Sequence, residues 1–414
     1  MITFNLDKDK NNWQIKSLGE LLTSLESGGR ATGGSVSYGI PSIGAEHLDD
    51  FGKLNFSSMK YVPKDYYYSM NKGKIFKGDI LVVKDGATTG KVSFIDNDFP
   101  FPESAVNEHV FIVRTNKHLL DPQFAFYYLY SSIGKLQILT DFRGSAQGGI
   151  SRGFVDKVHL PLPPLSIQKQ IAEILEKVDT AKQKRQEANK LTVEFLQSVF
   201  IEMFGDPVKN PKGWDMIHLG EVISVLMDYH SNGSYETLRN NVKLLDTPDY
   251  AYMIRTTDLE KQDYETDVKY VSKSSYEFLK KSKIFGGEII INKIGSAGQV
   301  YLMPYLNRKV SLGMNQFGLR FNEKANNIYI YFLLKSSYGE SIIKKKVQGA
   351  VTKTITKEAV RSLIIPLPPL SLQQQFAEIV NKTEALKEKQ KQSEQELENL
   401  FQCLMQRAFK GELV

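Results

Sequence analysis

The feature that most constrains the fold of this chain is a long internal repeat. The segment VHLPLPPLSIQKQIAEIL, Val158–Leu175, returns as LIIPLPPLSLQQQFAEIV, Leu363–Val380, 205 residues further on. Upstream of it, FKGDILVVKDGATTGKV at Phe76–Val92 returns as FGGEIIINKIGSAGQV at Phe285–Val300. A period this long excludes a solenoid of small units. The sequence therefore predicts one duplicated module, made of a globular domain followed by a helix.

Size and composition are those of a globular protein of two or more domains, since the chain has 414 residues. The opening has no apolar signal-peptide core, and no apolar run is long enough to span a bilayer. The single cysteine, Cys403, excludes an internal disulfide and favours a cytoplasmic location. Lys and Arg outnumber Asp and Glu by 53 to 47, which permits nucleic-acid binding without establishing it.

The first part of each module carries short strand patterns and one helical pattern. Gly78–Ile95 predicts a strand, a glycine turn and a second strand, and His109–Arg114 predicts a third. Asp121 precedes Pro122 as an N-cap precedes the first residue of a helix. We therefore expect an α/β domain in each copy. The predicted boundaries are 1–159 for the first domain, 160–205 for its proline hinge and helix, 206–364 for the second domain, and 365–414 for the second hinge and helix.

The prolines of LPLPPLS favour a stiff, extended approach to each helix, with Ser166 and Ser371 as predicted N-caps. Both helices carry apolar residues at alternating spacings of four and three, as a coiled coil does. The predicted seams are Ile167, Ile171, Ile174, Val178, Ala181, Arg185, Ala188, Thr192, Phe195 and Val199 in the first copy, and Leu372, Phe376, Ile379, Thr383, Leu386, Gln390, Ser393, Leu397, Leu400 and Leu404 in the second.

Two such helices, each roughly 57 Å long at 1.5 Å per residue, bury their apolar stripes most simply by pairing within the chain. An antiparallel pair gives a pseudo-twofold arrangement with one α/β domain at each end. The alternative is that each helix packs only on its own domain. The matched heptad register favours the pair.

The sequence offers no set of catalytic residues. GATTGKV at Gly86–Val92 lacks the spacing and the Ser or Thr of a phosphate loop, and GSAGQV in the second copy lacks the lysine. A tight turn between strands explains these glycines better. The six histidines form no zinc pattern. No nucleophile, base and orienting group can be assigned, so we expect a binding protein that is not itself an enzyme and that binds no metal.

Two similar heads on a spacer suit a ligand that repeats along a line, as duplex DNA does. Lysines would mostly neutralise phosphates, and Arg, Gln and Thr can read base edges. The candidate DNA-binding residues of the first head are Arg30, Lys84, Thr88, Lys91, Arg143, Gln147 and Arg152; those of the second are Arg239, Arg255, Lys293, Gln299, Lys345, Gln348 and Lys353.

Across its whole length the chain resembles the specificity subunits of type I restriction–modification systems. The resemblance rests on PLPPLSIQKQIAEIL and PLPPLSLQQQFAEIV before the helices, on GDILVVKDGATTGKV, and on FGDP at Phe204–Pro207. It implies two target-recognition domains, each reading half of a split DNA sequence, on helices that also dock two modification subunits. It implies that S-adenosylmethionine is bound by those modification subunits, and that ATP and Mg²⁺ are used by restriction subunits.

The second head departs from the first at KIGSAGQV, where its turn is shorter and less polar. Contacts therefore cannot be transferred residue by residue between the heads. Two other readings of the sequence stay open. One is a self-contained methyltransferase or nuclease with a recognition module, and the other is a coiled-coil adaptor whose two heads bind proteins.

Overall fold

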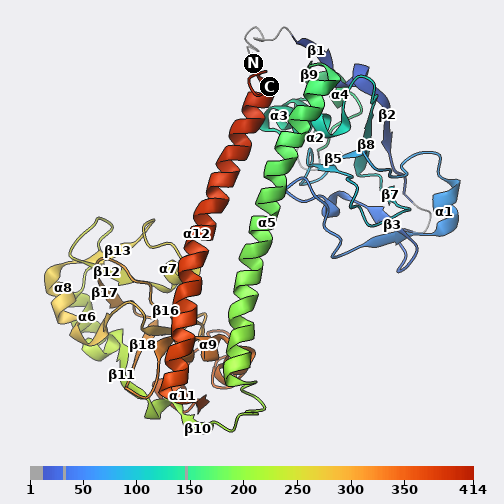
Figure 1. Cartoon of the computed structure of the whole chain (residues 1–414). Helices are drawn as coiled ribbons and strands as arrows, with labels where there is room; N and C mark the ends of the chain where they lie inside the picture. Colours follow the sequence, from blue (N-terminus) through green and yellow to red (C-terminus); the bar gives the residue numbers. More distant parts are fainter. Residues whose placement is uncertain (1–12, 31–33, 145–147) are drawn as a thin grey trace. The chain divides into compact units, whose positions relative to one another are not determined.

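The computed structural model describes residues 13–30, 34–144 and 148–414. The chain divides into two compact units (Figure 1). Unit 1 is Met1–Glu187 with Lys391–Val414, and unit 2 is Ala188–Gln390. The two long helices, α5 (Leu165–Phe204) and α12 (Leu370–Phe409), each contribute to both units. Gln147 lies outside the described residues.

Unit 1 is built on a four-stranded antiparallel sheet of order β2-β8-β5-β6, and β3 pairs in parallel with β7 in a smaller sheet of order β4-β3-β7. Strands β1 and β9 form a separate antiparallel pair. The strands of unit 1 are β1 (Gln14–Ser17), β2 (Leu22–Ser27), β3 (Ile40–Ile43), β4 (Lys60–Val62), β5 (Ile80–Val83), β6 (Val92–Phe94), β7 (Ala105–Val106), β8 (Val110–Thr115) and β9 (His159–Leu162). Its short helices are α1 (Lys64–Ser69), α2 (Pro122–Tyr130), α3 (Ser132–Leu139) and α4 (Phe154–Lys157).

Unit 2 repeats this arrangement in its sheet of order β11-β18-β15-β16 and in the pair β10-β19. Its second sheet, of order β13-β12-β17-β14, again contains one parallel pair, β12 with β17. The strands are β10 (Asp215–His218), β11 (Ile223–Asp228), β12 (Ala251–Ile254), β13 (Lys269–Val271), β14 (Lys283–Ile284), β15 (Ile289–Asn292), β16 (Val300–Leu302), β17 (Lys309–Leu312), β18 (Gln316–Phe321) and β19 (Ile364–Leu367). The short helices are α6 (Tyr235–Asn241), α7 (Thr256–Lys261), α8 (Lys273–Phe278), α9 (Asn327–Lys335), α10 (Ser337–Lys344) and α11 (Lys357–Arg361).

The apolar run of β5 is continuous because both of its faces are buried. Ile80 and Val82 belong to the core that includes α2 and the long helices, whereas Leu81 and Val83 belong to a second core beneath the smaller sheet. A strand covered on both sides has no polar face to present, so its residues do not alternate in polarity. The predicted strand–turn–strand is confirmed as β5 and β6, and the glycine turn between them has Gly86 at φ +93°.

The helix predicted after Asp121 is also confirmed, with one interruption. The Asp121 carboxylate accepts hydrogen bonds from the backbone N–H groups of Gln123 and Phe124, both at 3.0 Å, and Pro122 is the first helical residue. The helical pattern breaks at Ser131, which is extended at ψ 158° and both ends α2 and caps α3 by accepting a hydrogen bond from Gly134.

Both long helices begin one residue before the serines that we predicted as N-caps, so that prediction is wrong. Leu165 and Leu370 already belong to the helices, which places Ser166 and Ser371 in the first turn. The start of α5 is instead fixed by Gln168, a fully buried residue whose amide bonds the proline hinge.

The two long helices pair antiparallel within each unit. In unit 1 the Lys182 ammonium lies 2.6 Å from the Glu398 carboxylate. In unit 2 Thr192 hydrogen-bonds Gln390 at 3.2 Å, and Phe200, further along α5, contacts Phe376, which is earlier on α12. The predicted polar seam residue Gln390 therefore has a polar partner.

Along both long helices, every second residue of the predicted seam lies in the buried stripe. At the other positions the buried residue is the next one in the sequence. On α5, Leu196 is 2% exposed, whereas the predicted Phe195 is 50% exposed. On α12, Phe401 is buried and the predicted Leu400 is exposed. Both pairs are adjacent apolar residues, so the spacing alone fits two phases of the heptad and cannot decide between them.

Candidate nucleic-acid interface

In unit 1 the turn after β5 is joined to a distant segment that carries other candidates. The backbone of Ile150 donates a hydrogen bond to the carbonyl of Lys84 at 2.8 Å. Gly149 forms isolated β-bridges with both Asp85 and Arg143. The predicted residues Lys84 and Arg143 are therefore held by one small backbone network, although they are far apart in the sequence.

Arg30 lies near Lys84 because both side chains contact Glu108. Its guanidinium lies 4.0 Å from the Glu108 carboxylate, and the Lys84 ammonium donates to the Glu108 carbonyl oxygen at 3.4 Å. The next residue, His109, places Nδ1 2.5 Å from Asp85. Sequence reasoning missed His109 and Asp85, because a lone His and a lone Asp on different segments carry no motif.

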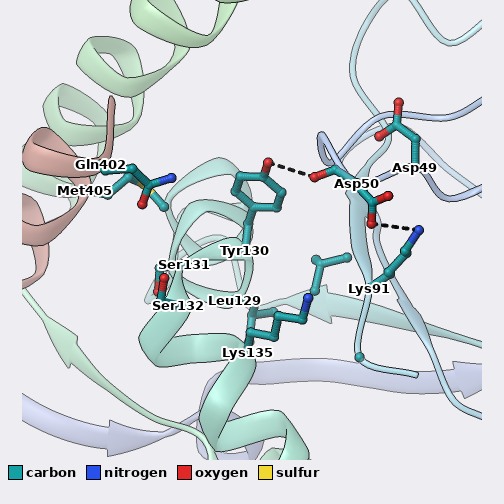
Figure 2. Close-up of a pocket in the computed structure, with 12 residues that line it drawn as sticks. Asp49, Asp50, Lys91, Leu129, Tyr130, Ser131, Ser132, Lys135, Gln402 and Met405 are labelled. Carbon is teal, nitrogen blue, oxygen red and sulfur yellow. Dashed lines mark hydrogen bonds and ion pairs between the residues drawn. The ribbon is translucent and has the colours of Figure 1, made fainter. Parts of the chain in front are cut away.

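Lys91 has a different environment. Its ammonium lies 2.8 Å from the Asp50 carboxylate, and the ion pair lines a cavity of about 210 Å³ beside Tyr130 and Lys135 (Figure 2). The hydrogen bond from Lys91 lowers the pKa of Asp50. Lys91 is thus mostly buried against its own domain. Thr88 lies in the same turn and is half-buried.

Unit 2 repeats the backbone network with different side chains. Thr354 bridges both Ile294 and Gln348, as Gly149 bridges Asp85 and Arg143 in unit 1. Gly295 donates a backbone hydrogen bond to the carbonyl of Lys353 at 3.1 Å. Gln348 and Lys353 are exposed. The predicted residues Lys293, Gln348 and Lys353 are therefore brought together, and Gln299 lies exposed in the same turn.

Asp228, at the end of β11, organises the charges of this region. Its carboxylate lies 3.2 Å from the Lys293 ammonium, 3.5 Å from that of Lys357 and 3.6 Å from Nδ1 of His230. Burial would raise the pKa of Asp228, but the backbone N–H of His230 and the two lysines outweigh it and lower the pKa. Sequence reasoning missed Lys357, although it stands 205 residues after the predicted Arg152.

The remaining candidates of unit 2 lie apart from this network. Arg255 is held by Asp258 at 2.7 Å and by Asp267 at 3.9 Å, so its guanidinium is committed to its own domain. Arg239 is exposed on α6, and Lys345 is exposed directly after α10.

A second cavity, of about 460 Å³, lies at the matching place in unit 2, between the turn after β15 and helices α9 and α10. Glu340 lines it where Lys135 lines the cavity of unit 1, but Lys335, Lys344 and Lys353 line it too, so this cavity is the more basic of the two. Among the described residues, no group of three or more His, Cys, Asp or Glu is placed to hold a metal ion. No helix in the described ranges is long and apolar enough to cross a membrane.

Comparison with known proteins gives a consistent result. The sequence pattern of the type I restriction modification DNA specificity domain matches the chain twice, at residues 10–193 and 211–399. The type I restriction enzyme MjaVIII specificity subunit of Methanocaldococcus jannaschii is 22% identical, over 97% of this chain and 93% of that protein.

Two solved structures share the fold. The S subunit of a type I restriction–modification system from M. genitalium is similar with a TM-score of 0.58 at 16% identity, over 96% of both chains. A chain from a structure on complex assembly and conformational transition of the type I R-M system is similar with a TM-score of 0.57 at 20% identity, over 97% of this chain and 98% of that one.

Proposed function

Because the chain belongs to the type I restriction modification DNA specificity family, we propose that it reads a split, asymmetric DNA target, with one unit for each half-site. Its role is to give a restriction–modification complex its DNA sequence specificity. The relatives are named as specificity subunits, a role distinct from catalysis.

The observation that carries this proposal is the duplication of a frame with different side chains. The family pattern matches once in each half, and both units share the order of the main sheet and the bridging network beside the turn. The side chains on that network differ, with Arg143 in one unit and Gln348 in the other. A common frame with different contact residues suits two different half-sites.

We propose that Lys91 and Arg255 act within their own domains and that the other candidates contact DNA; among these, Lys293 is also paired, with Asp228, and its side chain is 15% exposed. Lys91 and Arg255 form the ion pairs described above. The candidates left for DNA contact are Arg30, Lys84, Thr88, Arg143, Gln147, Arg152, Arg239, Lys293, Gln299, Lys345, Gln348 and Lys353.

The paired helices are proposed to dock two modification subunits, with restriction subunits joining the complex. In unit 2, Leu191 and Phe195 on α5 lie one helical turn apart and are about half exposed, although they are apolar. Such residues on an outer helix surface support a protein partner. S-adenosylmethionine, ATP and Mg²⁺ belong to the partners in this proposal.

A genome-wide map of adenine methylation tests the function directly. The host is mapped with the gene intact, deleted, and restored as Arg143→Ala or Gln348→Ala. We expect deletion to abolish methylation of one split motif, and each variant to relax or weaken only one half of that motif. A map that does not change on deletion, with partner subunits expressed, would refute the proposal.

A further inference from the structure

In unit 1 two cations, Lys84 and Arg152, lie against neighbouring strands of the main sheet. The Lys84 ammonium is 5.9 Å from the ring centre of Phe111 on β8. The backbone N–H of Ile150 donates to the carbonyl of Lys84, and Arg152 follows Ile150 by two residues. Nη1 of Arg152 donates to the carbonyl oxygen of Leu25 on β2 at 2.7 Å. Strands β2 and β8 are hydrogen-bonded neighbours, so both cations lie over the same pair of strands.

Unit 2 has a cation at each corresponding position. The Lys293 ammonium is 5.5 Å from the ring centre of Phe317 on β18. Ile355 donates a backbone hydrogen bond to the carbonyl of Lys293 at 3.0 Å, and Lys357 follows two residues later. The basic pair therefore recurs in the frame of both units, although the surrounding loops differ.

Strand register shows how the two pairs differ. Ser27 on β2 is opposite Phe111, and Asp228 on β11 is opposite Phe317, so Ser27 and Asp228 occupy equivalent positions. In unit 2, Asp228 binds both cations of the pair. In unit 1 Ser27 brings no charge, and the acidic neighbour is instead Asp85, whose carboxylate lies 3.8 Å from the Lys84 ammonium.

Resting on the DNA-binding function proposed above, we propose that Lys84 with Arg152, and Lys293 with Lys357, form one phosphate-binding pair that both units share. The phosphodiester backbone is the same at every half-site, so frame residues common to two different recognition units suit it. The residue at the Ser27 or Asp228 position contributes to the charge of each pair. In unit 1 the acidic neighbour is Asp85, next to Lys84 in the sequence, whereas in unit 2 it is Asp228 on a neighbouring strand.

The test measures the affinity of the full chain for a mixed-sequence DNA duplex over a series of salt concentrations. Each phosphate contact contributes about 0.9 to the slope of log affinity against log salt. Ser27→Asp would add one negative charge beside the two cations of unit 1, and we expect the slope to fall by about 0.9. Ser27→Asn introduces a side chain of nearly the same shape as aspartate but without its charge, and should leave the slope unchanged. Asp228→Asn should increase the slope.

Two further controls separate the pair from net charge and from folding. Lys64→Gln, on α1 and outside both pairs, removes one positive charge and should change the slope much less than Ser27→Asp. Thermal unfolding reports whether Asp228→Asn is folded, and Ser27→Asp tests the proposal independently of it.

The proposal is overturned if Ser27→Asp and Ser27→Asn have equal slopes, if Lys64→Gln matches Ser27→Asp, or if the chain binds no duplex at low salt. A methylation map that reports a split motif would still establish the specificity function in each of these cases. Failure of the phosphate-binding pair is therefore distinguishable from failure of the proposed function.

Discussion

Gln168 donates a hydrogen bond from Nε2 to the carbonyl oxygen of Pro163 at 2.8 Å. The same Nε2 also donates to Leu119, and Oε1 accepts from the backbone N–H of Asp121 at 2.8 Å. One buried amide thus joins the proline hinge, the start of α5 and the capping residue of α2. Gln373 makes the corresponding bonds in unit 2, to Pro368, Lys324 and Asn326.

Replacing this amide with an apolar group of similar size should destabilise unit 1. Gln168→Leu removes the partner of the carbonyl oxygens of Pro163 and Leu119 and of the N–H of Asp121, and each of these groups that is left buried costs about 1–3 kcal/mol. We expect a loss of roughly 3 kcal/mol in the free energy of unfolding, measured by urea denaturation. Gln170→Ala, on the exposed face of the same helix, is the control and should change little. Equal stability of the two variants would show that the hinge is held by other contacts.

The corrected phase of the coiled coil predicts opposite results for two neighbouring residues. Leu196→Ala removes a buried side chain from the core of unit 2 and should cost about 2–5 kcal/mol. Phe195→Ala removes a half-exposed ring and should cost less than about 1 kcal/mol. Urea denaturation of both variants decides the phase. A larger loss for Phe195→Ala would restore the phase predicted from the spacing alone.

The sequence predicts the duplicated α/β frame and the paired helices because the internal repeat and the heptad spacing can be read from the residues alone, without the contacts between them. It does not predict the exact phase of the seam, because Ile174–Leu175 and Leu400–Phe401 offer two apolar choices at each point. Nor does it predict Gln168 as the hinge residue, since a polar residue near a helix start is normally exposed. Only the fold shows that it faces three backbone groups.

The candidate site is predictable to a smaller extent. Lys84 and Lys293 can be found because they follow an apolar strand in both copies. Lys91 and Arg255 look equivalent to them in the sequence, and only their partners Asp50 and Asp258 show that they are committed within their domains. Asp228 itself has no sequence signal, because strand pairing brings it to Lys293 and Lys357 from a distant segment.

Asp179 on α5 predicts a stability change that depends on pH. It is buried, and this burial raises the pKa of its carboxyl; the ammonium groups of Lys53 and Lys182 and a hydrogen bond from Gln183 at 2.9 Å offset the effect only in part. The folded state therefore holds the proton more tightly than the unfolded state does. The wild-type chain loses stability as the pH rises from the unfolded value, about 3.9, through the raised folded value.

Asp179→Asn removes this ionisation while keeping an oxygen that can accept from Gln183. We expect the variant to be more stable than wild type at pH 7, by more than the roughly 0.5 kcal/mol typical of surface changes, because no charge has to be buried. Below about pH 4 the difference should vanish, because the wild-type carboxyl is then neutral in the unfolded state as well as in the folded state. Thermal unfolding across this pH range measures both points, with Asp65→Asn on the exposed face of α1 as the control. A variant that is less stable than wild type at pH 7 would mean that the attraction of Lys53 and Lys182 exceeds the cost of burying the Asp179 charge.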